Sequence, residues 1–309
     1  MKRSTRNSLL LMLTALIWGI AFVAQTTGGD AIGPFSFSGI RCIIGALALS
    51  VAIPILDRMG LTARKPVTRE EKLFLLKAGL IVGLIFFLAA NMQQVAISMG
   101  ASTGKAGFLT ACYSVMVPVL GVFLGKKCGL NIWIGVGLTF LGLYLLCING
   151  AFVLTGVDTL LLLCALFFSF HILAIDHYSP LLDGVRLARL QFIINAILSL
   201  IVAAFTEIHI GTPAAHDWLA ALATADAWIA LLYAGVCSCG IAYTLQIVGQ
   251  QDVNPTIASI IMSLEAVFSA LAGWLILKQY LSLKQITGCA LIFAAVVLAQ
   301  IEFPIRKKK

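Results

Sequence analysis

The stretch IASIIMSLEAVFSALAGWLIL, Ile257 to Leu277, is 21 residues long, is nearly all apolar and contains one charged residue, Glu265. At a rise of about 1.5 Å per residue, a helix of this length crosses the roughly 30 Å hydrocarbon core of a bilayer. The stretch therefore predicts a membrane-spanning helix, and it raises the question of why a carboxyl group lies inside it.

Similar apolar runs fill most of the chain. Of its 309 residues, 61% are hydrophobic and only 11% are charged, whereas soluble domains carry about a quarter charged residues. Ten runs are long enough to cross a membrane, at about 8–26, 35–56, 73–96, 103–124, 131–149, 157–175, 186–206, 227–248, 256–277 and 281–302. We therefore predict an all-α membrane protein with ten transmembrane helices and no separate soluble domain.

The basic residues are distributed unevenly between the predicted loops. If the N-terminus is cytoplasmic, sixteen Lys and Arg residues fall in cytoplasmic segments, and three, Lys105, Lys278 and Lys284, fall in outer loops. An excess of Lys and Arg marks the cytoplasmic loops of membrane proteins. We predict a multi-pass protein of the cell (inner) membrane with both termini cytoplasmic. The net charge of +8 then indicates topology and contact with anionic lipids, not nucleic-acid binding.

The two halves of the chain resemble each other. At a shift of 150 residues, Arg-Cys-Ile-Ile-Gly-Ala (41–46) falls on Gln-Phe-Ile-Ile-Asn-Ala (191–196), and at 152 residues Gln94 falls on Gln246. Each half holds five predicted helices, and because five is odd the second half must enter the membrane upside down. We predict two inverted five-helix repeats, residues 1–150 and 151–309, an architecture typical of secondary transporters with a substrate site near the midplane.

The segment that carries Glu265 has two faces when it is drawn as a helix. Bulky residues such as Ile260, Leu264 and Trp274 gather on one face, which we expect to contact lipid, whereas Glu265 lies among small residues on the other. A carboxylate in hydrocarbon costs about a few kcal/mol, so Glu265 should face protein or water. It is either a proton or substrate-cation site, or a buried carboxyl that hydrogen-bonds a Ser or Tyr to fix helix packing.

Arg41 lies near the outer end of the second predicted helix. Its planar guanidinium suits a carboxylate or another anion, although a long basic side chain near a helix end can also extend to the membrane interface. The repeat shift pairs Arg41 with Gln191 and Glu265 with Tyr113. The charged chemistry is therefore expected at one member of each pair.

Further polar side chains lie at membrane depth on the third, fourth, seventh and eighth predicted helices. Any one of them is more often a bridge between helices, worth about 0.6–2 kcal/mol, but together they are what a polar pathway requires. The ring of Trp18 either lines such a pathway or packs. The candidates for a substrate or proton pathway are Glu265, Arg41, Trp18, Asn91, Gln94, Tyr113, Gln191, Asn195, Tyr243 and Gln246.

No enzyme-like string has the structural context that its chemistry requires. Gly-Ala-Ser-Thr-Gly (100–104) matches a nucleophile motif by letter, but it follows a transmembrane helix instead of a strand. A membrane-embedded enzyme acting on lipid-linked substrates is the alternative from another class, and His171, Asp176 and His177 are its sparse set of catalytic groups. We expect no catalytic residue, no metal site and no cofactor, and we do not expect an enzyme.

Three segments resemble the EamA family of the drug/metabolite transporter superfamily: ALIWGIAFV (15–23), LLYAGVCSCGIAYTL (231–245) and ASIIMSLEAVFSALAGWLILKQYLSLKQITGCALIFAAVVLA (258–299). The resemblance covers essentially the whole chain and implies a ten-helix metabolite permease. Family members often carry Leu-Glu-Pro at the position of Glu265. Ala266 replaces that proline, which argues against a helix break at this point.

These observations together predict a secondary transporter, not driven by ATP, that exports small polar metabolites such as amino acids by alternating access. An exporter of lipophilic cations or drugs, with Glu265 as the counter-charge, is the alternative within transport. The expected partners are a small-molecule substrate, a proton and membrane lipids, with a second copy of the chain in a homodimer as a further candidate.

Overall fold

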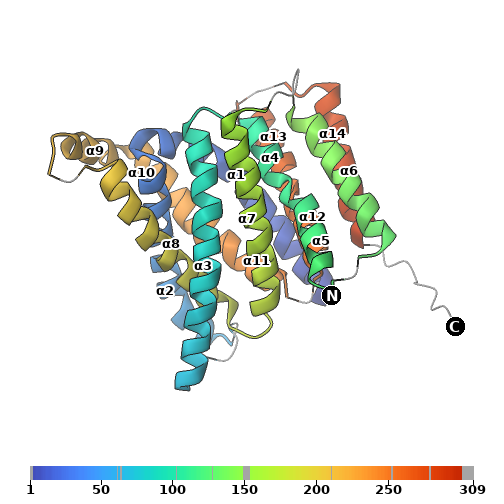
Figure 1. Ribbon diagram of the computed structural model, residues 1–309, viewed down its shortest axis with the longest axis horizontal. Coiled ribbons are helices and arrows are strands. Elements are labelled where there is room, and N and C mark those ends of the chain that lie inside the picture. The colour runs from blue at the N-terminus through green and yellow to red at the C-terminus, as the bar shows by residue number, and fades with distance from the viewer. Residues whose placement is uncertain are drawn as a thin grey trace.

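A computed structural model of the chain describes residues 3–60, 62, 65–101, 103–126, 128–148, 154–209, 211–251, 253–277 and 280–300. Within these ranges the regular structure is entirely helical, and the helices stand side by side in one bundle (Figure 1). In chain order they are α1 (Arg3–Ile32), α2 (Pro34–Arg58), α3 (Arg69–Ser98), α4 (Thr103–Ala111), α5 (Tyr113–Phe123), α6 (Leu130–Cys147), α7 (Gly156–Tyr178), α8 (Gly184–Thr206), α9 (Ala214–Leu222), α10 (Ala225–Leu232), the π-helix η1 (Tyr233–Tyr243), α11 (Thr244–Gly249), α12 (Pro255–Met262), α13 (Leu264–Leu277) and α14 (Leu283–Gln300).

The predicted fold class is confirmed. In the described ranges, nine helical segments are long and apolar enough to cross a bilayer, and the shorter apolar segment Pro255–Leu271 makes the tenth crossing. The fourth, eighth and ninth crossings consist of consecutive shorter helices, whereas α9 is a nine-residue helix in the loop between α8 and α10. Each repeat has five crossings, so the second repeat is inverted relative to the first.

Two repeat-related crossings are interrupted near their middle. α4 gives way to α5 at Cys112 (φ −58°, ψ −13°), and α12 gives way to α13 at Ser263 (φ −61°, ψ −13°). Ser114 and Ser263 each donate a hydroxyl hydrogen to the carbonyl three residues earlier, at 2.8 and 2.6 Å, and such back-bonding bends helices. The expectation of an unbroken crossing, drawn from Ala266, is therefore wrong, because α12 ends at Ser263 although no proline stands there.

The eighth crossing differs from its counterpart in the first repeat. It contains η1, 11 residues of π-helix, whereas α3 is α-helical throughout its length. π-helical segments are rare, and those that occur lie frequently at functional sites.

Apolar side chains form two main cores. One core joins residues of α1, α4 to α7 and α12 to α14 with the end of α3, and the other joins residues of α2, α3, α8, η1 and α11 with Ile175 of α7. Trp18 and Phe168, near the middle of α1 and α7, pack against both cores. The space around these two rings is therefore the boundary between the two cores.

The prediction that the bulky face of the ninth crossing contacts lipid is only partly correct. Trp274 is 50% exposed, as expected, but Ile260 and Leu264 are fully buried. The reason is that α12 lies against α1, α5, α6, α7 and α14, so protein surrounds the first part of this crossing. A helical wheel identifies the small-residue face but not how many neighbours cover the other one.

Glycine brings α6 and α14 into close contact. A Cβ at Gly288 would lie 2.6 Å from the carbonyl oxygen of Gly142 and 2.7 Å from the backbone nitrogen of Leu146. Gly288→Val is therefore expected to lower the free energy of unfolding by about 1–3 kcal/mol, because the backbones must separate. Unfolding in detergent measures the loss. Gly137→Val on the same α6 is the control, since a Cβ there meets nothing within 4 Å, and equal losses would contradict the close contact.

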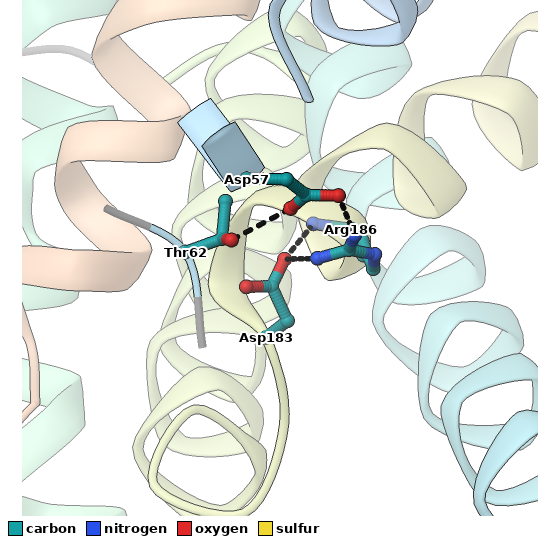
Figure 2. Close-up of polar contacts among 4 residues, drawn as sticks. All are labelled: Asp57, Thr62, Asp183 and Arg186. Carbon is teal, nitrogen blue, oxygen red and sulfur yellow. Dashed lines mark hydrogen bonds and ion pairs between the residues drawn. The ribbon is translucent and has the colours of Figure 1, made fainter. Parts of the chain in front are cut away.

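Arg186 ties α8 to α2 at the face where α1 begins. Its guanidinium pairs with Asp57, at the end of α2, at 2.6 Å and with Asp183 at 3.3 Å (Figure 2). Asp57 also accepts a hydrogen bond from the Thr62 hydroxyl at 2.6 Å. Asp183 caps α8, since its carboxylate accepts a hydrogen bond from the backbone N–H of Arg186 at 2.8 Å.

At the opposite face, Glu207 ties the other ends of the same two helices together. Glu207 is the repeat partner of Asp57 at a shift of 150. Its two carboxylate oxygens accept hydrogen bonds from two backbone N–H groups in the first turn of α2, at 2.8 and 2.7 Å. The N-cap residue of α2 is Gly33, with φ 90°, where a Cβ would lie 2.6 Å from the Glu207 carboxyl carbon. A carboxylate from the second repeat therefore caps α2, as Asp183 caps α8.

Candidate functional site

A cavity lies at the boundary between the two cores. Trp18 and Phe168, the two rings that contact both cores, border it. Because each ring lies near the middle of its helix, the cavity is near the centre of the bundle. Substrate sites of transporters with inverted repeats lie at this depth, between the repeats.

Much of the cavity lining consists of repeat-related residues. The shift of 150 pairs Trp18 with Phe168 and Phe22 with Ile172, and the shift of 152 pairs Thr110 with Met262 and Tyr113 with Glu265. All eight of these residues border the cavity. The two repeats therefore contribute equivalent positions of α1 and α7, and of the fourth and ninth crossings, to one shared space.

Six of the residues predicted from the sequence border this cavity, and four do not. The six are Glu265, Arg41, Trp18, Tyr113, Tyr243 and Gln246, and the four are Asn91, Gln94, Gln191 and Asn195.

Glu265 meets its own repeat partner. It lies in the first turn of α13, is 6% exposed, and its Oε1 accepts a hydrogen bond from the Tyr113 hydroxyl at 3.1 Å. Each of the two residues lies just after the interruption of its crossing, which brings equivalent positions of the two repeats together.

Arg41 is buried in the cavity wall without an acidic partner. It is 4% exposed, and its guanidinium carbon lies 5.5 Å from the centroid of the Phe37 ring. Among the described residues its Nε has no hydrogen-bond partner, and no carboxylate lies within ion-pair distance. The side chain therefore does not extend to the membrane interface. A buried charge without a partner is costly, and a carboxylate or similar anion in the cavity would lower that cost.

Aromatic rings form a rigid wall on another side of the cavity. The Tyr243 ring lies 4.6 Å from that of Trp18, 4.8 Å from that of Phe86 and 5.7 Å from that of Phe192, measured between centroids. The planes are inclined by 56°, 73° and 78°, which are favourable tilted and edge-to-face arrangements. These contacts fix the ring of Trp18 beside the cavity.

Asn91 and Asn195, both predicted as pathway residues, bridge helices instead. The Asn91 amide donates hydrogen bonds to Asn195 Oδ1 at 3.1 Å and to the Ser199 hydroxyl at 3.0 Å. Asn195 also lies 2.9 Å from the Cys42 sulfur. This buried group connects α3, α8 and α2, which is the structural role that the sequence favoured for any single polar residue.

Gln191 and Gln94 also bridge helices. Gln191 Oε1 lies 2.9 Å from His171 Nε2, which connects α8 to α7, and both side chains are fully buried. The Gln94 amide donates to the backbone carbonyl of Gln25 at 2.8 Å, which connects α3 to α1.

The sequence did not single out several residues that border the cavity, among them Gln25, Thr110, Phe168 and Ser238. The repeat shift applied to Trp18 would have found Phe168. Nothing in the sequence distinguishes Gln93, which faces the cavity and donates to the Thr110 hydroxyl at 3.2 Å, from its neighbour Gln94.

No metal site is formed in the described part of the chain, where no three His, Cys, Asp or Glu side chains gather closely enough to hold an ion. The structure describes all eight cysteines, and none of them forms a disulfide.

An inverted repeat of transmembrane helices with a partly polar cavity between its halves is the architecture of many membrane transporters. The sequence model of the EamA-like transporter family matches residues 6–148 and again residues 155–300, so one match falls in each half. The chain belongs to this family, which is part of the drug/metabolite transporter superfamily.

Relatives of similar length carry transporter names. An uncharacterized transporter of Archaeoglobus fulgidus is 30% identical over 297 residues, which cover 94% of this chain and 84% of the relative. The uncharacterized transporter YoaV of Bacillus subtilis is 27% identical over 305 residues, which cover 96% and 97%. A crystal structure with 18% sequence identity superposes with a TM-score of 0.75 over 95% of this chain and 98% of that chain, so the two share a fold.

Proposed function

We propose that the protein is a secondary transporter that exports small polar metabolites such as amino acids by alternating access. Residues 1–150 and 151–309 are the two repeats that move relative to each other. The observation that carries the proposal is the cavity between the two cores, whose lining includes four repeat-related pairs. When the halves of an inverted repeat exchange conformations, such a cavity opens first to one side of the membrane and then to the other.

The charges in the cavity support a substrate that is polar and bears a carboxylate. Arg41 contributes a positive charge that has no carboxylate partner among the described residues, and Glu265 contributes a carboxyl group that accepts a hydrogen bond from the Tyr113 hydroxyl. An amino acid carries one group complementary to each. Glu265 also favours the second candidate, a lipophilic cation, but the positive charge of Arg41 in the same cavity opposes it.

Glu265 is the proposed proton site, because a buried carboxyl group in a transport cavity can gain and lose a proton as the cavity changes sides. Transport is driven by substrate and proton gradients, without ATP and without an enzymatic step. The uneven distribution of Lys and Arg supports an inner-membrane location with both termini cytoplasmic. Under that orientation Arg186 and its two acidic partners lie at the cytoplasmic face.

Flux measurements in proteoliposomes test the proposal. Vesicles are loaded with radiolabelled amino acids or with a lipophilic cation, and efflux is followed with and without a pH gradient. We expect efflux of at least one amino acid at a rate that depends on pH, and no efflux from vesicles that lack the protein. Preferential efflux of the cation would support the second candidate, and no flux of any compound by folded protein would contradict transport.

A further inference from the structure

Comparing equivalent positions of the two repeats shows which side-chain groups the fold requires at each position. Where both repeats carry similar residues, the scaffold alone accounts for them. Among the pairs with a member in the cavity that differ in chemistry are Trp18 with Phe168, Arg41 with Gln191, and Glu265 with Tyr113. In each pair one repeat carries a group that the other repeat folds without.

Trp18 and Phe168 show this difference most clearly. Both rings pack against both cores and both border the cavity, so an aromatic ring satisfies the packing at either position. Trp18 adds an indole N–H to that ring. Its Nε1 is buried and has no hydrogen-bond partner among the residues that the structure describes. The structure therefore shows no role in folding for this N–H group.

Arg41 and Gln191 repeat the pattern. Gln191 is fully buried and lies 2.9 Å from the His171 ring nitrogen, so it has a structural partner. Arg41 borders the cavity, is 4% exposed, and its Nε lacks a partner within the described ranges. Trp18 and Arg41 thus bring two unpartnered donors to one cavity, from α1 and α2.

We propose that Trp18 and Arg41 form a two-part carboxylate site: the guanidinium of Arg41 supplies the charge, and the indole N–H of Trp18 donates a hydrogen bond to the same carboxylate of the transported molecule. The proposal rests on the transport function proposed above and names Trp18 as a determinant of its specificity. Indole and guanidinium groups only donate hydrogen bonds. An ammonium group only donates them, so the pair excludes it, and the charge of Arg41 favours a carboxylate, which accepts two charge-assisted hydrogen bonds, over a neutral ester.

The position of Trp18 is fixed by packing before a substrate arrives. Its ring lies 4.6 Å from the ring of Tyr243, which is itself held by Phe86 and Phe192. A donor that is already oriented loses little conformational freedom on binding. The indole N–H therefore discriminates between substrates more sharply than a donor on a flexible side chain would.

The repeats also supply the mildest test variants. Trp18→Phe introduces the residue that its repeat partner Phe168 already carries, and it keeps the ring while removing the N–H. Arg41→Gln introduces the residue found at Gln191. The control is Trp228→Phe, because Trp228 lies on α10, is 43% exposed and does not border the cavity.

The test compares the twenty L-amino acids with their methyl esters, in proteoliposome flux and in thermal stabilisation of detergent-solubilised protein. For the amino acid that the parent protein moves fastest, Trp18→Phe is expected to raise KM about 10-fold, the effect of losing a hydrogen bond to a charged group, with little change in maximal rate. Arg41→Gln is expected to raise KM further. Competition by the methyl ester should be equally weak in the parent and in both variants.

Three outcomes separate the claims. An unchanged KM for Trp18→Phe, with Trp228→Phe also unchanged, would overturn the carboxylate site while leaving transport intact. Equal transport of acid and ester by the parent protein would overturn it as well. If no amino acid is transported and none raises the melting temperature, both the carboxylate site and the proposed function are wrong.

Discussion

Replacing Glu265 with glutamine is expected to remove the pH dependence of transport and to lower its rate about 10- to 100-fold, the range associated with losing the interactions of a charged group. Glutamine has the shape of a protonated glutamic acid and its carbonyl can still accept the Tyr113 hydrogen bond, but it cannot release a proton. The cavity would therefore behave as if Glu265 were permanently protonated. Flux in proteoliposomes across a series of pH values measures both effects.

Two variants separate titration of Glu265 from its contact with Tyr113. Tyr113→Phe removes the hydroxyl that donates to Glu265 Oε1 at 3.1 Å but leaves the carboxyl able to titrate, so the pH dependence should shift without disappearing. Glu70→Gln, on the exposed first turn of α3, should behave as the parent protein does. A Glu265→Gln protein with the parent rate and pH profile would show that Glu265 serves helix packing alone.

Replacing Arg186 with methionine is expected to cause the largest loss of stability at the face where α1 begins. The substitution removes the Arg186 guanidinium from Asp57 and from Asp183, whose side chain is 1% exposed. Removing one partner of a fully buried pair costs about 3–5 kcal/mol. We expect about 2–3 kcal/mol here, because Asp57 is 31% exposed and keeps the Thr62 hydroxyl, and Asp183 keeps its cap on α8. Unfolding in detergent measures the change.

A second ion pair at the same face provides the matched control. Lys126 and Asp176 lie 2.5 Å apart, but the lysine side chain is 44% exposed, and exposed pairs contribute about 0–1 kcal/mol. Lys126→Met should therefore cost far less than Arg186→Met. Adding Asp57→Asn to Arg186→Met should recover part of the loss, because it removes a carboxylate that has lost the Arg186 guanidinium. Equal losses for Arg186→Met and Lys126→Met would contradict a specific tie between α2 and α8.

The crossings and the repeats could be predicted from the sequence because both depend on one-dimensional patterns. An apolar run of about twenty residues predicts a membrane-spanning helix. A constant shift between similar segments can be detected without knowing how the helices pack. Ser263, which interrupts the ninth crossing without proline, was missed because serine is tolerated in many straight helices. Its hydroxyl donates to the carbonyl of Ile260 at 2.6 Å, a contact that the sequence alone does not show.

The cavity could be predicted only in part, because its lining depends on how helices rotate against their neighbours. Glu265 stood out as the one charge in its crossing. Asn91 and Gln93 are equally polar and lie two residues apart on α3, yet Asn91 bonds to α8 and Gln93 borders the cavity. The residue type alone therefore does not distinguish the helix-bridging side chain from the one that borders the cavity. The repeat shift is the sequence signal that adds information, since it pairs Thr110 with Met262 across the cavity.

Accessibility of one cavity residue from both sides of the membrane tests alternating access most directly. Ser238→Cys is a small change at a residue that borders the cavity. A membrane-impermeant thiol reagent is applied to intact cells and to inverted membrane vesicles, and adducts beyond those of the parent protein are counted by intact mass. We predict one additional adduct from each side, with less labelling when the transported amino acid is present. Labelling from one side only, under every substrate and pH condition, would contradict alternating access through this cavity.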